Sequence, residues 1–431
     1  MLIHVVEPED TIYSIARRYG VSAERLLTDN GLGRFQPLVV GQTIVVLFPV
    51  EVHTVKPGDT LTKIAADYGV SVNSLLQNNP ILTSNWFLYE GQTIVIRFDD
   101  QKQGFIAING YVYPFINRWL LRRQLPYLTY LSIFTYGFTP DGNLVIPDDE
   151  EIIATALEYG TAPLMVFTAM SEAGTFSSDL AARLFNDLEL QQKVLDALAD
   201  VIVEKGYYGI DVDFEFVGGE NSAAFVEFMQ RLHQRMEALG KVVFVTLAPK
   251  ISSDQPGVLY EGHDYGGLGA GADRALLMTY EWGYTFGPPM AVAPINNVRQ
   301  VVEYAVTQIP IRKLMLGMPN YGYDWPLPYV QGETMALTIG NMQAVEIARR
   351  NRVAIQFDEV AQAPFFRYFF PPEGREHEVW FEDARSVQAK ARLVNEYGLY
   401  GIGIWQLMRY FPQMWLVLNS MFHIIKLLPT P

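Results

Sequence analysis

The N-terminal part of the chain carries one pattern of apolar and polar positions twice. The stretch His-Val-Val-Glu-Pro-Glu-Asp-Thr-Ile at 4–12 returns as His-Thr-Val-Lys-Pro-Gly-Asp-Thr-Leu at 53–61. Each copy continues with apolar residues every three to four positions and then Gly-Val-Ser, which is typical of an amphipathic helix that stops at a glycine. A second, serine-capped helical segment follows, and each copy closes on Gly-Gln-Thr-Ile-Val, whose β-branched residues indicate a strand. The pattern predicts two βααβ modules, at 1–49 and 50–99.

Behind the repeat, short apolar runs alternate with segments of helical period. The apolar runs lie at 105–111, 127–136, 163–169, 209–214, 242–247, 275–280, 314–317 and 401–405. The helical segments between them include 152–159, 190–204, 222–239, 298–308 and 386–397. Near-continuous apolar strands that alternate with helices indicate a parallel sheet covered on both faces. Eight such units predict an α/β fold, a closed (β/α)8 TIM barrel within 100–431.

The barrel region is longer than a plain barrel, which needs about 250 residues. The extra length falls before the last strand, at about 326–383. Its pieces are a helical segment at 342–351 and strand-like runs at 353–357, 365–370 and 377–381. We therefore predict a small α+β insertion that walls one side of a groove. The apolar stretch 415–428 is interrupted by polar residues and is too short to span a membrane, so we expect a packed C-terminal helix there.

Composition narrows the possible chemistry. The 431 residues include no cysteine, which excludes disulfides, thiolate metal sites and a cysteine nucleophile. The six histidines show no spacing typical of metal ligands, and we expect neither a metal nor another cofactor. A net charge of −15, without a run of Lys or Arg, argues against nucleic acid and membrane surfaces as partners. The start of the chain does not resemble a secretory signal. We also expect the protein to be a monomer.

One predicted strand carries acidic residues where its neighbours are apolar. From Tyr208 the sequence reads Tyr-Gly-Ile-Asp-Val-Asp-Phe-Glu. The period of a strand points Asp211, Asp213 and Glu215 to one side, into the barrel, and such barrels have their active sites at the carboxyl ends of the strands. Three acids on one buried face raise at least one pKa, which leaves a carboxylic acid protonated near neutral pH. Because the other strands supply no balancing cations, we interpret the trio as catalytic.

The N-terminal repeat resembles the LysM module throughout both copies. That family binds glycans that contain N-acetylglucosamine, and the resemblance implies contacts from two loops of each module. The loops after the first strand contribute Asp10, Thr11, Gly58, Asp59 and Thr60. The loops after the second helix contribute Gly31, Leu32, Pro80, Ile81 and Leu82. The Asp-Thr side chains are explained equally well as helix caps, and the turn at Glu9 is expected to differ from that at Gly58.

The barrel region, over about 102–410, resembles glycoside hydrolase family 18. The family motif on the fourth strand is Asp-Gly-x-x-Asp-x-Asp-x-Glu, and this chain keeps its last three acids but has Tyr208 for the first Asp, a departure expected to affect strand packing. The segment 278–281, Met-Thr-Tyr-Glu, resembles the Met-x-Tyr-Asp element of the sixth strand, with Glu for Asp. The segment 317–322 resembles the seventh-strand element Gly-x-Pro-x-Tyr-Gly, and Trp405 ends the eighth strand as the family's sugar platform does.

The resemblance implies a retaining mechanism in which the acetamide of the substrate is the nucleophile. Glu215 is then acid and base, Asp213 accepts a hydrogen bond from the acetamide N–H, and Asp211 holds Asp213 in place. Tyr280 orients the acetamide carbonyl, and Trp405 stacks under the sugar. The remaining expected groove residues, for which packing is an equally good explanation, are Tyr111, Met278, Glu281, Trp282, Asn320 and Tyr321.

The segments 278–290 and 379–384 resemble the spore-cortex peptidoglycan N-acetylglucosaminidases of spore-forming bacteria, which share the order LysM, LysM, barrel and lack a conventional signal. We therefore predict a glycosidase of the spore cortex, coat or cell wall that cleaves peptidoglycan after N-acetylglucosamine. Two alternatives stay open: a chitinase or chitooligosaccharidase, and a spore-coat lectin without activity. On a modular interpretation, deletion of 1–98 weakens binding to insoluble wall and spares small soluble substrates.

Overall fold

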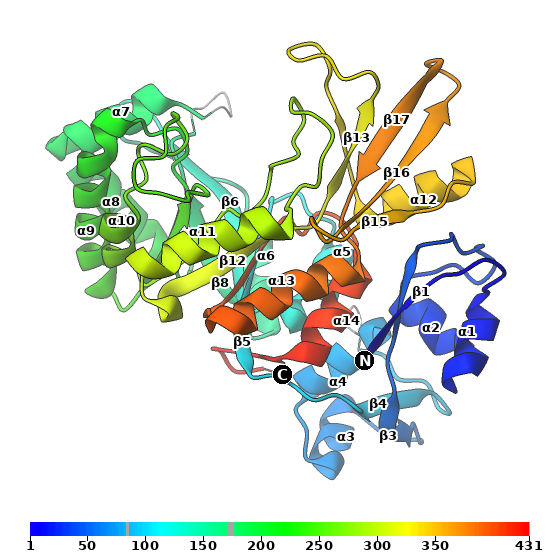
Figure 1. The fold of residues 1–431 in the computed structure, drawn as a ribbon. Coiled ribbons are helices and arrows are strands. Elements are labelled where there is room, and N and C mark those ends of the chain that lie inside the picture. The colour runs from blue at the N-terminus through cyan, green and yellow to red at the C-terminus, as the bar shows by residue number, and fades with distance from the viewer. Residues whose placement is uncertain (83–85, 171–175, 431) are drawn as a thin grey trace.

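The computed structural model of the protein describes residues 1–82, 86–170 and 176–430. Figure 1 shows a barrel with an antiparallel sheet above its mouth and two small modules packed against its side and base. None of the helices in the described ranges has the length and apolar character to cross a membrane.

Each N-terminal module has the predicted order of strand, helix, helix and strand. The first comprises β1 (Leu2–Val5), α1 (Ile12–Tyr19), α2 (Ala23–Asp29) and β2 (Thr43–Val46). The second comprises β3 (Pro49–Thr54), α3 (Leu61–Tyr68), α4 (Val72–Asn78), the 3-10 helix η1 (Pro80–Leu82) and β4 (Thr93–Phe98). The two strands of each module pair antiparallel, which confirms the βααβ prediction.

The turn before the first helix is built alike in both modules. The hydroxyls of Thr11 and Thr60 each accept a hydrogen bond from a backbone N–H in the first turn of the helix that follows, so both threonines are N-caps. Glu9 has a φ of 70° and Gly58 a φ of 82°. The expected difference between these turns is therefore absent, and the first module keeps the turn with a non-glycine residue in the left-handed region, at a cost in backbone energy.

Eight parallel strands close into the barrel, as predicted. They are β5 (Phe105–Val112), β6 (Tyr130–Phe138), β8 (Ala162–Phe167), β9 (Gly209–Val212), β10 (Val242–Leu247), β11 (Arg274–Leu277), β12 (Leu314–Pro319) and β18 (Gly401–Trp405). Each pairs with the next in this order, and β18 pairs with β5 to close the ring. A short strand, β7 (Leu144–Val145), extends β6 as a hairpin. β9 and β11 end before their apolar runs do, at Val212 and Leu277.

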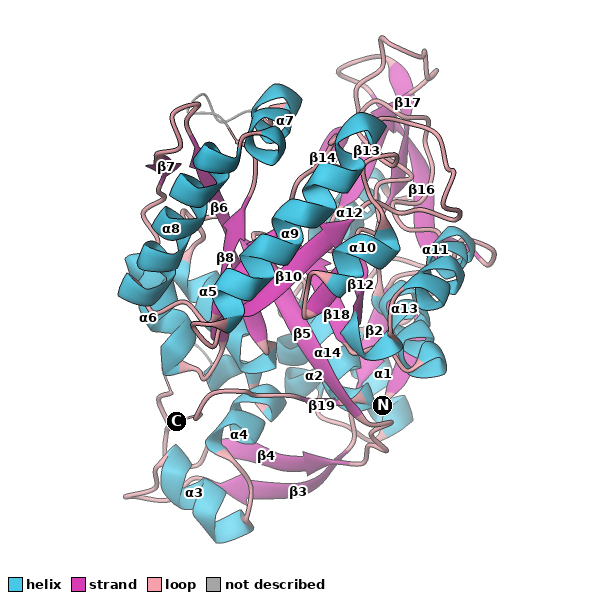
Figure 2. Cartoon of the chain, turned by 90° about the vertical axis from the view of Figure 1, so that its left-hand side faces the viewer, coloured by secondary structure: helices cyan, strands magenta, loops and turns pink. Residues whose placement is uncertain are grey.

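Helices pack on the outside of the strands on the sides seen in Figure 1 and Figure 2. They are α5 (Arg118–Gln124), α6 (Glu150–Glu158), α7 (Ser178–Asn186), α8 (Leu188–Glu204), α9 (Ser222–Glu237), α10 (Tyr265–Ala270), α11 (Ile295–Gln308), α13 (Ala384–Tyr397) and α14 (Pro412–Met421). The short 3-10 helices η2 (Leu125–Tyr127), η3 (Gly219–Asn221) and η4 (Ile311–Lys313) each lie between an outer helix and a barrel strand. The sequence pattern missed α5, α7 and α10. α5 and α10 have only seven and six residues, and α10 is rich in glycine.

The insertion forms an antiparallel sheet with one helix. Its strands, in order across the sheet, are β14 (Leu337–Ile339), β13 (Gly322–Pro326), β17 (Arg375–Trp380), β16 (Ala363–Phe370) and β15 (Gln356–Asp358), with the helix α12 (Asn341–Asn351). The sheet begins at Gly322, before the predicted start at about 326. Close pairing requires glycine there, because a Cβ on Gly322 would lie 2.3 Å from the carbonyl oxygen of Trp380.

The C-terminal helix is shorter than predicted. α14 ends at Met421, and the strand β19 (His423–Ile424) then pairs with the start of β5. β18 pairs with β5 only from Ala107 onward, and His423 and Ile424 pair with the two residues before it, Phe105 and Ile106. The helix prediction over 415–428 is therefore wrong beyond Met421.

The modules are packed tightly on the barrel. The amide of Gln413 on α14 donates hydrogen bonds to Asn30 and to the backbone carbonyl of Thr43 in the first module. Gly41 meets the insertion, where a Cβ would lie 1.9 Å from the carbonyl oxygen of Ile355. The apolar core of the second module is continuous with the core around the barrel. Modules, insertion and barrel therefore form one packed unit.

Candidate active site

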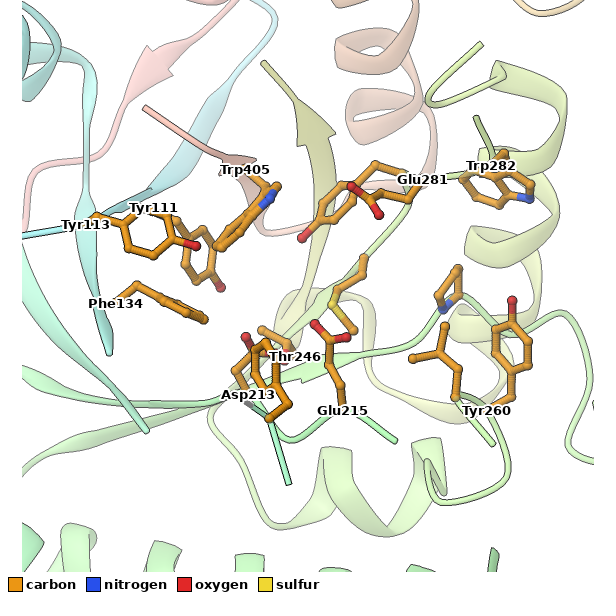
Figure 3. Close-up of a pocket in the computed structure, with 15 residues that line it drawn as sticks. Tyr111, Tyr113, Phe134, Asp213, Glu215, Thr246, Tyr260, Glu281, Trp282 and Trp405 are labelled. Atoms are coloured by element: carbon orange, nitrogen blue, oxygen red, sulfur yellow. Dashed lines mark hydrogen bonds between the residues drawn. The ribbon is translucent and has the colours of Figure 1, made fainter. Parts of the chain in front are cut away.

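The acids predicted from the fourth strand lie at the mouth of the barrel. Asp211 is within β9, whereas Asp213 and Glu215 follow the end of the strand. Phe214, between them, turns outward and packs among other phenylalanines. This alternation turns Asp213 and Glu215 toward one pocket of about 260 Å³ (Figure 3).

Asp211 is fully buried below the pocket and does not line it. Its Oδ2 accepts a hydrogen bond of 2.7 Å from the hydroxyl of Ser132, which itself accepts one of 2.9 Å from the amide of Asn109. Burial raises the pKa of Asp211 to about 7, against the effect of the Ser132 hydrogen bond. Tyr208, the departure from the family motif, precedes β9 at its other end, where its ring contacts Tyr130 at 6.2 Å.

The two acids that line the pocket differ in their surroundings. Asp213 is 5% exposed, its carboxylate accepts a hydrogen bond from Thr246, and burial raises its pKa to about 6. Glu215 is half-buried; burial first, and then the charges of Asp213 and Glu281, raise the pKa of Glu215 to about 8. No Lys or Arg is found among the described residues that line the pocket. At neutral pH, Glu215 is therefore protonated and can donate a proton.

Two aromatic residues predicted to act on the substrate line the same pocket. Tyr280 follows β11, and burial, with the charge of Asp213 next, raises its pKa well above the usual value, so it stays a phenol that can donate. Its ring fits because position 317 is glycine: a Cβ there would lie 2.9 Å from Tyr280. Trp405 ends β18, and its ring meets that of Phe134 edge-on at 5.3 Å.

Glu281, which replaces the aspartate of the family element, occupies a constrained position. Its φ of 67° lies in the left-handed region. Its Oε1 accepts hydrogen bonds from the hydroxyls of Tyr321 at 2.9 Å and Tyr323 at 3.1 Å. Glu281 lines the pocket, whereas Tyr321 does not line it and contacts it through this hydrogen bond to Glu281.

The other predicted groove residues divide between lining and support. Tyr111, Met278 and Trp282 line the pocket. Asn320 does not; its amide donates to the carbonyls of Gln406 at 3.1 Å and Arg409 at 3.0 Å. It therefore holds the loop that follows Trp405.

Sequence reasoning missed about half of the pocket. The missed lining residues are Tyr113, Phe134, Phe176, Thr246, Pro249, Leu259 and Tyr260. Thr246 had a signal, since it is the one hydroxyl residue in the apolar run of β10. Most of the others lie on loops, whose course the pattern of strands and helices does not predict.

A buried histidine that sequence reasoning also missed fixes the backbone next to Glu215. His263 lies between β10 and α10 and is inaccessible to solvent. Its Nδ1 accepts a hydrogen bond of 3.1 Å from the N–H of Ala248, so its Nε2 donates the 3.1 Å bond to the carbonyl of Phe214. Burial lowers the pKa of His263 to about 4, which keeps the ring neutral in this one tautomer.

Some of the module residues predicted to contact the glycan are exposed to solvent, and others are not. In the loops after the first strands, Asp10 and Asp59 turn inward, with Oδ2 at 2.9 Å from His4 Nε2 and at 2.8 Å from His53 Nε2. The exposed members of the same loops are Thr11, Gly58 and Thr60.

In the loops after the second helices, Ile81 is 54% exposed, whereas Leu82 is buried and contributes to the core. Pro80 is buried and Leu32 is half-buried. Gly31 faces the barrel, and a Cβ there would lie 2.9 Å from the ring of Pro412. These loops of the modules therefore adjoin the barrel.

Comparison with known proteins agrees with this architecture. The sequence pattern of Glycosyl hydrolases family 18 matches residues 166–409, and that of the LysM domain matches 4–47 and 53–97. The chain is 40% identical to the cortical fragment-lytic enzyme of Bacillus subtilis strain 168, over 99% of each protein. The crystal structure of the Bacillus cereus spore cortex-lytic enzyme SleL matches with a TM-score of 0.83 at 36% identity, covering 99% of this chain and 98% of that one. A chitinase from Chromobacterium violaceum matches at 25% identity with a TM-score of 0.68, over 73% of this chain and 98% of the chitinase.

Proposed function

The chain belongs to the glycosyl hydrolases of family 18 and carries two LysM modules, and from this membership we propose that it is a retaining N-acetylglucosaminidase of spore-cortex peptidoglycan. The observation that carries the proposal is the pair at the end of β9. Glu215 is held as a neutral acid, with a pKa raised to about 8, next to the buried carboxyl of Asp213. This pair supplies a proton donor and an acceptor for an amide N–H.

The first step is the departure of the leaving group. Glu215 gives its proton to the glycosidic oxygen as the bond from that oxygen to C1 breaks. The 2-acetamido carbonyl oxygen of the same sugar forms a bond to C1, which gives an oxazolinium intermediate. The Asp213 carboxylate accepts the hydrogen bond of the acetamide N–H and stabilises its positive charge, and the Tyr280 hydroxyl orients the acetamide carbonyl.

The second step restores the enzyme. Glu215, now ionised, takes a proton from a water molecule, and the water oxygen attacks C1 from the side the leaving group has left. The bond between C1 and the acetamide oxygen breaks, and the product keeps the original configuration. Asp211 fixes Asp213 from below, and Trp405 supports the sugar ring.

Two features argue against a carboxylate nucleophile from the protein. Asp213 is buried and engaged by Thr246, and it lies on the same side of the chain as Glu215. Glu281 is held by Tyr321 and Tyr323. We therefore propose the acetamide of the substrate as the nucleophile, which membership of a family among the exceptions to the two-carboxylate mechanism supports.

The names of the relatives support cortex as the substrate. The Bacillus subtilis relative is called a cortical fragment-lytic enzyme and the Bacillus cereus structure a spore cortex-lytic enzyme, both with near-complete coverage. We infer a spore-associated location and peptidoglycan as the partner of the LysM modules. The chitinase from Chromobacterium violaceum keeps chitin as the second candidate, because the acetamide mechanism does not distinguish the neighbouring sugar.

Side-by-side digestion tests the substrate. Purified cortex fragments and chitin oligomers are incubated with the protein, and the products are separated by mass. We expect efficient release from cortex fragments; cleavage of chitin but not of cortex would overturn the proposal. The Glu215→Gln variant tests the lectin alternative, since it should lose hydrolysis by at least about 100-fold while still binding the glycan. Unchanged hydrolysis in this variant would mean that the acid lies elsewhere.

A further inference from the structure

Three aromatic side chains follow β5 along the chain, from the catalytic pocket to the first turn of α5. Tyr113, which lines the pocket, contacts Trp405 at 6.2 Å and stacks on Phe115 at 5.3 Å, with the rings 19° from parallel. The Phe115 side chain is 78% exposed. Trp119 follows in the first turn of α5 and is 50% exposed. We call Tyr113, Phe115 and Trp119 the aromatic track.

The far end of the aromatic track is rigid and touches the first LysM module. The Trp119 ring meets Tyr410 at 5.8 Å, and the guanidinium of Arg123 lies over both rings, at 4.7 and 5.2 Å. Arg123 also donates a 3.0 Å hydrogen bond to the Tyr410 hydroxyl. A Cβ on Gly31 would lie 3.0 Å from the Tyr410 ring. Gly31 and Leu32 form the loop that the LysM resemblance assigns to glycan binding, so the track ends at that loop.

The aromatic track lies on one side of the bond to be cleaved. In Figure 3, Tyr113 is on the Asp213 side of the pocket, and Trp282 is on the Glu215 side. The pKa of Tyr113 is raised first by burial, next by the charge of Asp213 and less by the charge of Glu215. This agrees with a position of Tyr113 on the Asp213 side. Since Asp213 binds the acetamide of the sugar that supplies C1 and Glu215 protonates the leaving oxygen, the track follows the nonreducing side. This assignment rests on the proposed function.

The chemistry of the aromatic track suits a neutral sugar chain. Exposed aromatic faces stack on sugar rings, and rings fixed in place lose little entropy on binding. Two cations lie at the track, and both have partners. Arg118 donates to the carbonyls of Pro114 and Ile116 and pairs with Glu151. Arg123 has two rings and a hydroxyl as partners, so neither is well placed to attract an anion. The track is also continuous with the pocket through the Tyr113 and Trp405 contact.

We propose that one glycan strand, bound in the catalytic pocket, continues on its nonreducing side across Phe115 and Trp119 to the Gly31–Leu32 loop of the first LysM module. The module and the pocket then hold the same strand. The module extends the substrate groove of the barrel, and long strands gain contacts that short fragments do not reach.

Kinetics on substrates of two lengths test the aromatic track. Soluble cortex glycans are fractionated into tetrasaccharides and long fragments, and kcat/KM is measured on both for the wild type, Phe115→Ala and Trp119→Ala. We expect the ratio of kcat/KM for long fragments to that for tetrasaccharides to fall about tenfold in each variant, equivalent to about 1.4 kcal/mol. Phe369→Ala, which removes an exposed ring of the insertion away from the track, is the control and should keep the ratio.

The outcomes separate this inference from the proposed function. If the wild type hydrolyses both substrates and the ratio is unchanged in Phe115→Ala and Trp119→Ala, the aromatic track does not bind the glycan strand. The proposed function then still stands. If the wild type hydrolyses neither substrate, the proposed function itself fails, and the inference with it.

Hydrogen exchange tests the contact with the module directly. In the Glu215→Gln protein, long cortex fragments should slow amide exchange in the segment 30–35, and tetrasaccharides should not. Adding Trp119→Ala should remove this protection. Three results would each overturn the proposal of a shared strand. They are protection of the segment 30–35 by tetrasaccharides, equal protection with and without the Trp119 side chain, and no protection by long fragments.

Discussion

At the scale of the residue, the site depends on carboxyl groups placed where burial opposes their ionisation. Asp211, Asp213 and Glu215 have pKa values raised to about 7, 6 and 8, and burial is the first cause in each. No described Lys or Arg lines the pocket to reverse this effect. The same burial that disfavours the charged forms therefore keeps Glu215 ready as an acid at neutral pH.

These pKa values predict the pH dependence of hydrolysis. Glu215 loses its proton as the pH rises through about 8, so kcat/KM should fall about tenfold per pH unit above that value. Asp213 gains a proton as the pH falls through about 6, which removes its acceptor charge, so kcat/KM should also fall on the acid side. A pH profile on soluble cortex fragments checks both limbs. Activity that keeps rising above pH 9 would exclude Glu215 as the acid in the rate-limiting step.

The sequence could reveal the site residues that differ in chemical type from their neighbours, and it could not reveal the others. Asp211, Asp213 and Glu215 stand out because charged residues interrupt an apolar strand. Thr246 carried a similar, weaker signal. Tyr113 and Tyr260 lie on loops, where an aromatic residue looks the same whether it packs or binds.

At the scale of the element, the end of β9 is what aims the acids. β9 stops at Val212, and the backbone beyond it is fixed by the N–H of Asp213, which donates to the carbonyl of Phe167 at 2.9 Å, and by His263. The Phe214 ring anchors the same segment among buried phenylalanines. Glu215 is therefore held by contacts of the residue before it.

Removing His263 should separate positioning from chemistry. In His263→Ala, the carbonyl of Phe214 and the N–H of Ala248 lose their partner, which should cost about 1–3 kcal/mol of stability. Because small displacements of a catalytic group cost about 100-fold, kcat should fall by about that factor with little change in KM. Steady-state kinetics and thermal unfolding measure the two effects.

The control for this variant is His233→Ala. His233 is partly exposed and does not line the pocket. Its Nε2 lies 3.4 Å from Oδ1 of Asp273. It should leave kcat and Tm near the wild-type values. If His263→Ala folds with wild-type kcat, the segment around Glu215 does not need this support.

The elements themselves were largely predictable, and the exceptions have physical reasons. Long helices such as α8 and α9 show a full apolar period, whereas α10 is short and glycine-rich. The helix predicted over 415–428 ends early because pairing along β5 competes with it after Met421. Tertiary contacts of this kind leave no local pattern in the sequence.

At the scale of the whole molecule, the LysM modules are part of the packed body rather than flexible tethers. Asn78 of the second module accepts a 3.2 Å hydrogen bond from Asn419, and the carbonyl of Gln77 accepts one of 2.7 Å from Tyr127. Tyr127 and Trp415 stack at 5.3 Å, and both are almost fully buried in the shared core. The repeat predicted the modules but gave no sign of this interface, since its residues look like ordinary module surface.

Deletion of 1–98 should therefore do more than the modular interpretation expects. Exposure of large apolar side chains in the barrel should cost about 2 kcal/mol for each one, so the truncated protein should unfold at lower temperature and lose activity on soluble tetrasaccharides as well as on insoluble cortex. Calorimetry and hydrolysis assays measure this. A truncated barrel with wild-type Tm and tetrasaccharide hydrolysis would restore the modular interpretation.

A point variant isolates glycan binding from packing. Ile81 is 54% exposed in the second module, so Ile81→Ala should leave Tm unchanged while reducing retention on insoluble cortex severalfold. A lower Tm in this variant would show that Ile81 stabilises the fold.

The most direct test of the central claim, substrate-assisted cleavage after N-acetylglucosamine, is proton NMR of the reducing end that is first released from cortex fragments. We predict N-acetylglucosamine at that end and the β anomer in the earliest spectra, before mutarotation. A muramic sugar at the new reducing end, or the α anomer in the earliest spectra, would contradict the account.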